Sequence, residues 1–221
     1  MSINTSDLAV GQVVTGFSCP IVAKYTYSSG EVSYSNGMDL ARGVKLDPKI
    51  ETGGEDNVFY ANNRSAESAQ KRFKSGTLGL TVDGLLRAAE NLIMGLGSSS
   101  TSTVTVGTGG TATTYNMTDY GDAQEIPYVG VGSVIRSQSN GIEMFRAVVY
   151  PKVRFNQFTV PAETQGEDID WQTTELSGQL NRDDTSKHNW QRVSDPVATE
   201  LEAYNIARAV LSMTAATALP V

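Results

Sequence analysis

Alternating hydrophobic and polar residues recur along this 221-residue chain and predict β-strands. In the segment GTLGLTV (76–82), Leu78, Leu80 and Val82 alternate with small polar residues, as in a strand with one buried face. Residues 13–35 contain two shorter alternating runs separated by a Ser-Ser-Gly turn, which favours a hairpin.

Three further strand-like segments follow in the second half of the chain, at 126–136, 143–155 and 168–182. The first two are separated by Asn140-Gly141, a strong hairpin signal. Pro151 is expected at a sheet edge or a bulge, because proline has no N–H for a central strand. In the third segment apolar and polar residues alternate, which predicts that one face of this strand is exposed to solvent.

Helical spacing of apolar residues occurs in two places. The first predicted helix covers about 83–95, with Asp83 as N-cap and an end at Gly95–Gly97. The second covers about 196–212, with Asp195-Pro196 as N-cap and first residue, and lies in a C-terminal tail, 196–213.

Two stretches lack a clear period. Residues 36–57 contain two turn signals and a proline, and are expected to form a long loop or one strand with a long excursion. The Gly/Ser/Thr-rich stretch 98–114 lacks the lysine of a phosphate-binding loop, so a small exposed hairpin is expected there. Together the elements predict one domain, 1–221, with a mainly β antiparallel sandwich or barrel and one packed helix.

Charge and cysteine content narrow the function classes. The net charge is −7 and the pI is about 4.8, whereas tight DNA binding needs a basic patch. Cys19 is the single cysteine, so no internal disulfide can form. The sequence shows no signal peptide and no membrane-span pattern, and we expect folding in a reducing cytosol.

The sequence offers few candidate catalytic or metal-binding residues. His188 is the only histidine and lies in a polar segment without a nucleophile motif, so we expect no catalytic residues. Acidic residues cluster between Glu163 and Asp170, and Asp183 stands beside Asp184; both groups are interpreted as solvated carboxylates, and neither a metal nor a cofactor is predicted.

Three segments, in order, resemble the major tail proteins of siphophages, the tail tube proteins of the phi13-like group. They are 44–86, which runs from a charged loop through VFYANN to the first predicted helix, 126–155 and 161–182. The matching residues of the first segment are Glu55, Tyr60, Ala61, Asn62, Gly76, Leu78, Leu80, Val82 and Asp83. Those of the third segment are Pro161, Glu163, Trp171, Gln172, Thr173, Leu176 and Gly178. The hairpin at 98–114 is an insertion relative to this pattern.

The resemblance implies a structural virion protein. Such proteins form six-fold rings that stack into a hollow tail tube, with strands in an inner barrel and a long loop that reaches the next ring. The implied partners are other copies of the chain, a tape measure protein, and the tail terminator and baseplate or tip proteins. DNA passes through the lumen without specific binding. The implied location is the virion tail, assembled in the host cytoplasm.

On this basis the segments VFYANN, GTLGLTV, KVRFNQF and WQTTELSGQL are expected in the inner sheet. Asn62, Glu175 and Gln179 are the lumen candidates. The inter-ring loop is expected within 36–57, and its candidate residues are Leu46, Asp47, Lys49 and Glu51.

Two other functions remain open from the residues alone. One is a carbohydrate-binding β-sandwich module with Trp171 or Trp190 as a stacking platform. The other is a small hydrolase that uses His188 or the acidic cluster. A tube protein polymerises, whereas a binding module stays monomeric, so the assembly state separates the tail tube from the carbohydrate-binding module. Loss of an activity in a folded His188→Ala variant would favour the hydrolase.

Overall fold

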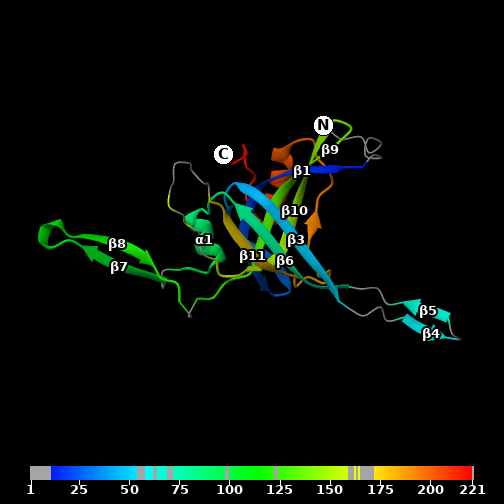
Figure 1. Cartoon of the computed structure of the whole chain (residues 1–221), viewed down its shortest axis with the longest axis horizontal. Coiled ribbons are helices and arrows are strands. Elements are labelled where there is room, and N and C mark those ends of the chain that lie inside the picture. Colours follow the sequence, from blue (N-terminus) through cyan, green and yellow to red (C-terminus); the bar gives the residue numbers. More distant parts are fainter. Residues whose placement is uncertain are drawn as a thin grey trace.

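The computed structural model describes residues 11–53, 58–61, 64–68, 72–97, 100–121, 124–158, 162, 164 and 172–220. Figure 1 shows a mainly β body with two helices and two separate hairpins that extend away from it. This confirms the predicted fold class.

One antiparallel sheet forms the body, in the strand order β2-β1-β9-β10-β11-β6-β3, with the short strand β12 added to β10. Its strands are β1 (Val13–Ser28), β2 (Glu31–Asp39), β3 (Gly43–Gly53), β6 (Arg72–Val82), β9 (Val129–Ser139), β10 (Ile142–Phe155), β11 (Thr174–Asn181) and β12 (Arg192–Val193). The two hairpins are β4 (Val58–Ala61) with β5 (Arg64–Ser68), and β7 (Thr101–Val106) with β8 (Thr113–Thr118). A short 3₁₀ turn, η3 (Gly109–Thr111), lies at the tip of β7–β8.

Turn residues place the strands as the sequence predicts. Ser29-Gly30 between β1 and β2 and Asn140-Gly141 between β9 and β10 all have positive φ, the conformation that tight hairpin turns require. Pro151 lies where the register of β10 against β9 shifts, between Tyr150 and Val153. The predicted bulge at this proline is therefore confirmed.

The sheet coils around the larger of two hydrophobic cores. β1 and β3 are far apart in the strand order, yet they contact each other. A Cβ added at Gly43 in β3 would overlap the ring of Phe17 in β1. The enclosed core joins side chains from β1, β6, β9, β10 and β11 to α1 (Arg87–Ile93). One face of each of these five strands thus contributes to the core inside the coil.

The second core lies on the outer face of the sheet, under α2 (Glu200–Val210). Ala203, Tyr204 and Ala207 of the helix are buried against β9 and β10. Buried β10 residues alternate between the two cores: Val148 and Tyr150 face the inner core, whereas Ala147 and Val149 face α2. This double burial explains the nearly continuous apolar run of β10.

The first helix is shorter than predicted. α1 begins after Leu86, and Asp83 is not its N-cap. The Asp83 carboxylate instead accepts the backbone N–H of Arg42 at 3.0 Å and pairs with the Arg42 guanidinium. The predicted end is confirmed, because Gly95 follows the last turn with φ +66°.

The second helix also begins later than predicted. Val197 is bonded in both directions to the backbone of Phe145 in β10, so the chain is still extended there. Thr199 is the N-cap, and its hydroxyl accepts the Glu202 N–H at 3.3 Å. Thr199 and Glu202 form the spacing of a capping box, a signal that identifies this start better than Asp195 does.

Two further expectations concern the first half of the sheet. Of the two alternatives for residues 36–57, a long loop or one strand with a long excursion, the structure favours a strand, because Gly43–Gly53 form β3 along β6. The inter-ring candidates within it were expected in a loop, and this part of the expectation is wrong. The described part of the VFYANN segment, Val58–Ala61, was expected in the inner sheet, but it forms β4 and pairs with β5. The exposed hairpin expected at 98–114 is confirmed as β7–β8 and continues to Thr118.

Candidate functional site

Among the described residues, the strand order of the main sheet ends in two edge strands, β2 and β3, each of which is paired on one side only. An edge strand carries backbone N–H and C=O groups that a strand of another chain can bind. Val44 in β3 is 55% exposed, and Ile50 is 37% exposed. These edges are the candidate functional surfaces for assembly.

The predicted inter-ring residues all lie on the β3 edge. Leu46 packs against the inner core, whereas Asp47 lies 3.8 Å from the ammonium groups of both Lys45 and Lys49. Glu51 accepts a hydrogen bond from Ser75 of β6 at 2.9 Å. The structure therefore brings these residues together on an edge strand, and a reaching loop is not formed by them.

Two of the lumen candidates lie on β11. Glu175 and Gln179 are exposed and alternate with the buried Leu176 and Leu180, as predicted. Asn62 lies outside the described residues. Whether the polar face of β11 lines a lumen stays a prediction.

The surroundings of Gln179 are basic. Gln179 lines a pocket of about 370 Å³ together with Lys74, Lys152 and Arg182. Lys152 pairs with Asp184 at 2.6 Å, and the Arg182 guanidinium lies 5.6 Å from the Phe73 ring centre. Although the chain has a negative net charge, the side chains around Gln179 are therefore mainly basic.

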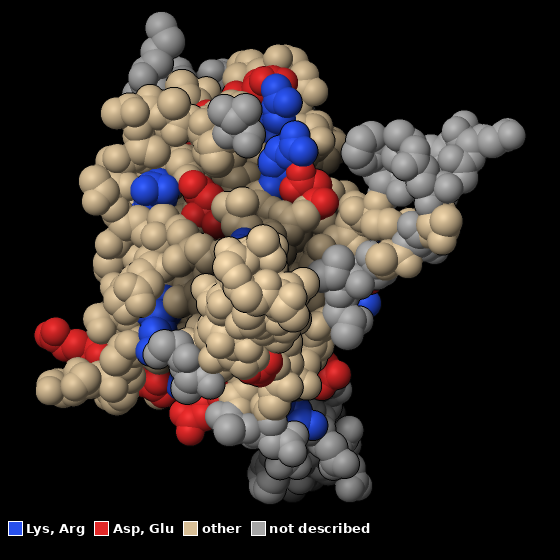
Figure 2. Space-filling view, turned by 90° about the vertical axis from the view of Figure 1, so that its left-hand side faces the viewer, with Lys and Arg blue, Asp and Glu red and all other residues tan. Residues whose placement is uncertain are grey.

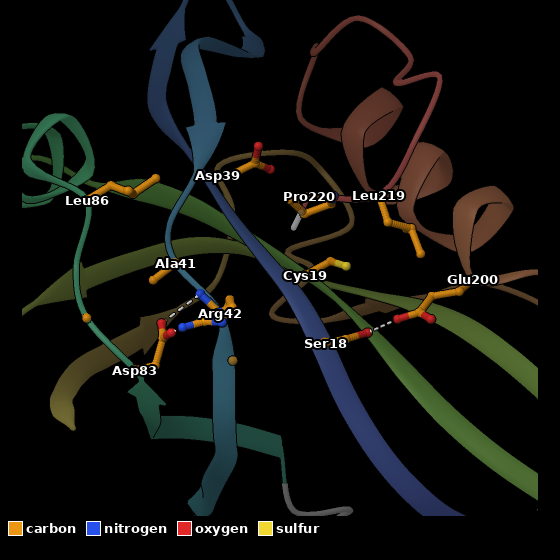
Figure 3. A pocket seen from close by; sticks show the side chains of 12 residues that line it. Ser18, Cys19, Asp39, Ala41, Arg42, Asp83, Leu86, Glu200, Leu219 and Pro220 are labelled. Atoms are coloured by element: carbon orange, nitrogen blue, oxygen red, sulfur yellow. Dashed lines mark hydrogen bonds and ion pairs between the residues drawn. The ribbon is translucent and has the colours of Figure 1, made fainter. Parts of the chain in front are cut away.

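A larger cavity, of about 500 Å³, opens between the body and the C-terminal tail. Figure 3 shows Ser18 and Cys19 of β1, Asp39 of β2, Glu200 of α2 and Leu219 of the tail around it. A register shift in β1, between Ser18 and Ile21, places Cys19 at φ +50°. The bulge exposes the thiol to the cavity.

Each carboxylate of this cavity already has a partner. Glu200 accepts a hydrogen bond from Ser18, and Asp39 accepts one from Tyr204. Burial raises the pKa of Tyr204 to about 12, and its bond to Asp39 adds to this rise. These pairs join β1, β2 and α2, which is a structural role.

Burial also raises the pKa of the Cys19 thiol above its usual value, and the nearby carboxylates of Glu200 and Asp39 raise it further. A raised pKa keeps the thiol protonated, and the protonated form is a weak nucleophile and a weak metal ligand. The cavity therefore offers polar groups for contact, and its cysteine is not activated.

His188 lies in a tight turn that is organised by Asp183. The buried Asp183 carboxylate accepts the Asn189 N–H at 2.9 Å and the Thr185 hydroxyl at 2.6 Å. His188 has φ +50°, and its Nδ1 lies 3.3 Å from the Asp183 carbonyl oxygen. These contacts show how the turn is held.

Asp184, next in the chain, faces a different cluster. It accepts hydrogen bonds from Lys152 at 2.6 Å and from the Tyr25 hydroxyl at 2.8 Å. The Lys152 bond is the main cause of the lowered pKa of Asp184. Asp183 and Asp184 thus take part in separate hydrogen-bond networks.

Trp190, one of the two candidate stacking platforms for carbohydrate, already packs against another aromatic ring. Its ring stacks on Phe73, with 5.4 Å between ring centres and 8° between the planes. Trp171 and the acidic residues Glu163, Glu167, Asp168 and Asp170 lie outside the described residues. Within the described ranges, no three histidine, cysteine or carboxylate side chains gather as a metal site, and no helix is long and apolar enough to span a membrane.

No protein-family model matches the chain, and no curated protein matches it.

Proposed function

We propose that this protein is a self-assembling structural subunit, the repeating unit of a phage tail tube. The observation that carries the proposal is the open architecture of the sheet, which ends in β2 on one side and β3 on the other. An edge of 11 residues, as in β3, is long for an unpaired strand. Pairing with another copy would satisfy its free backbone groups.

The two edges differ from each other, so pairing β2 of one copy with β3 of the next is a heterologous contact. Such contacts repeat in the same direction and close into a ring when the rotation allows it. The ordered resemblance of three segments to siphophage tail tube proteins supports a six-fold ring and its stacking into a tube. The proposed partners are then further copies, a tape measure protein, and terminator and baseplate or tip proteins, in a virion tail through which DNA passes.

The contact between stacked rings needs a segment that extends beyond the sheet. Because 43–53 is a strand, we assign this contact to the hairpin β4–β5, which continues from the far ends of β3 and β6 (Figure 1). Deleting Leu46–Thr52 would remove an edge strand from the body and would damage the fold. Replacing 58–68 with a Gly/Ser linker is the better test of stacking, since these residues pair only with each other in the described structure.

A charged side chain on the β3 edge tests the proposed ring contact. A lysine in place of the exposed apolar Val44 puts an unpaired charge into the proposed contact, so Val44→Lys should shift assembly to at least about tenfold higher protein concentration. The matched control is Val193→Lys, because Val193 is 52% exposed and lies in β12, away from both edges. Assembly is measured by sedimentation and the fold by circular dichroism.

Equal assembly of the two lysine variants, with both folded, would contradict the β3 edge as the ring contact. Loss of assembly in both would indicate a general charge effect and would also count against it.

A further inference from the structure

The hairpin β7–β8 has two faces of different chemistry. Directly opposed residues of an antiparallel pair point to the same side. Val104 opposes Tyr115, and Ser102 opposes Met117. The side chains of this apolar face are 47% exposed at Val104, 59% at Val106, 54% at Tyr115 and 50% at Met117.

The opposite face is polar throughout. It consists of Thr101, Thr103, Thr105, Thr114, Asn116 and Thr118. A cross-strand hydrogen bond of 3.1 Å joins the hydroxyls of Thr105 and Thr114. A two-stranded hairpin is marginally stable alone in water, so an amphipathic hairpin with a bare apolar face gains most from a cover over that face.

The base of the hairpin is tied to α1. The Arg87 guanidinium donates to the Thr118 hydroxyl, and the Tyr120 hydroxyl donates to Glu90. Asp119 receives a hydrogen bond from Ser102 at 3.0 Å and gives its N–H to the Ser100 carbonyl at 2.7 Å. The apolar face is therefore held in a defined direction, which lowers the entropic cost of binding.

The hairpin also carries no charge. The chain has 41 charged residues, 17 basic and 24 acidic, yet none occurs between Glu90 and Asp119. Figure 2 looks onto the side from which β7–β8 project, and the central protrusion is free of the blue and red that mark charged residues. Two copies of a chain with net charge −7 repel each other, so a charge-free arm is the part that approaches another copy with least repulsion.

We infer that the apolar face of β7–β8, formed by Val104, Val106, Tyr115 and Met117, packs on a second copy of this chain. Four half-exposed side chains offer a few hundred Å² at most, on the order of the largest patch of a monomer. A stable two-protein interface needs roughly 1,200 Å² or more. The face is thus too small to hold a partner alone and fits a contact that adds to others between copies. This inference rests on the proposed self-assembly and adds a second contact, separate from the sheet edges.

Neighbouring residues supply a matched test. Val104→Lys places a charge on the apolar face, whereas Thr103→Lys places the same charge on the polar face of the same strand. Both positions are exposed, so both variants should fold, as checked by circular dichroism and melting temperature. We expect Val104→Lys to raise the concentration for half-assembly by at least about tenfold, and Thr103→Lys to change it by less than about twofold.

Crosslinking identifies the occupant directly. Tyr115→p-benzoylphenylalanine is prepared in both isotopically light and heavy protein, and the two are mixed before assembly and illumination. We expect crosslinked peptides that join a light chain to a heavy one. Crosslinks confined to one chain, or none, together with equal effects of the two lysine variants, would overturn the inference.

The outcomes separate the two proposals. If tubes form without light–heavy crosslinks and also form from the Val104→Lys variant, the proposed tail tube stands and the proposed β7–β8 contact is wrong. Light–heavy crosslinks in small oligomers that never form rings would support this contact and contradict the tube. A chain that stays monomeric at every concentration would overturn both.

Discussion

Lys152 is the central cation of a cluster that contains Asp184 and two tyrosine rings. Its ammonium group lies 2.6 Å from the Asp184 carboxylate, 5.2 Å from the Tyr25 ring centre and 4.8 Å from that of Tyr128. Cation–π contacts of this kind favour the charged lysine. The Lys152 side chain is only 15% exposed, whereas that of Asp184 is 37% exposed. The cluster fixes β10 against the loop that follows β11.

A pH-dependent contribution to stability follows from Asp184. The Lys152 bond lowers the pKa of Asp184 below 3.8, so the charged form is favoured in the folded state. A depressed folded pKa gives stability that is present above the unfolded pKa and is lost as pH falls through the folded pKa. Asp184→Asn should cost about 1 kcal/mol at pH 7, allowing for solvent screening.

The same substitution should cost much less at a pH below the folded pKa, where the wild-type carboxyl is also neutral. Urea denaturation of both proteins at neutral and at strongly acidic pH measures the difference. An unchanged cost at the two pH values would show that charge on Asp184 does not contribute.

At the scale of elements, the start of α2 gives a direct comparison between two candidate caps. The Thr199 hydroxyl accepts the Glu202 N–H, whereas the exposed Asp195 precedes the extended residues that bond to β10. Thr199→Ala should lower the free energy of unfolding by about 1 kcal/mol. Asp195→Ala should change it by less than about 0.5 kcal/mol.

Thermal or urea denaturation compares the two alanine variants. A larger loss for Asp195→Ala than for Thr199→Ala would mean that the helix begins near Asp195.

The strands and hairpins were predictable because their signals are local. Alternation marks β6 and β11, and Asn140-Gly141 marks the β9–β10 turn within a few residues. The start of α1 was not predictable in this way. Asp83 has the sequence context of an N-cap, but its carboxylate is bound by Arg42, 41 residues earlier. A partner so far away in the sequence cannot be identified from the residues around Asp83.

The choice between loop and strand at β3 stayed open for a related reason. Its residues Gly43–Gly53 include a proline and alternate poorly, so only pairing with β6 makes them a strand. The cavity at Cys19 was also unpredictable, since it forms from β1, β2, α2 and the tail. By contrast, the polar positions Glu175 and Gln179 followed directly from the period of β11.

At the scale of the whole molecule, three features lie outside the closed cores. They are the unpaired edges β2 and β3, the hairpin β4–β5 and the amphipathic hairpin β7–β8. Two cores, one inside the coiled sheet and one under α2, stabilise the body. Each of these features presents backbone or apolar groups that another chain can cover. We propose that all three form contacts between copies.

Self-assembly is tested by electron microscopy of the purified full chain, concentrated step by step. We expect rings of one defined symmetry that stack into hollow tubes, with the fraction of assembled protein rising steeply with concentration. Fields of single monomers at the highest concentration, even after addition of tail initiation proteins, would contradict it.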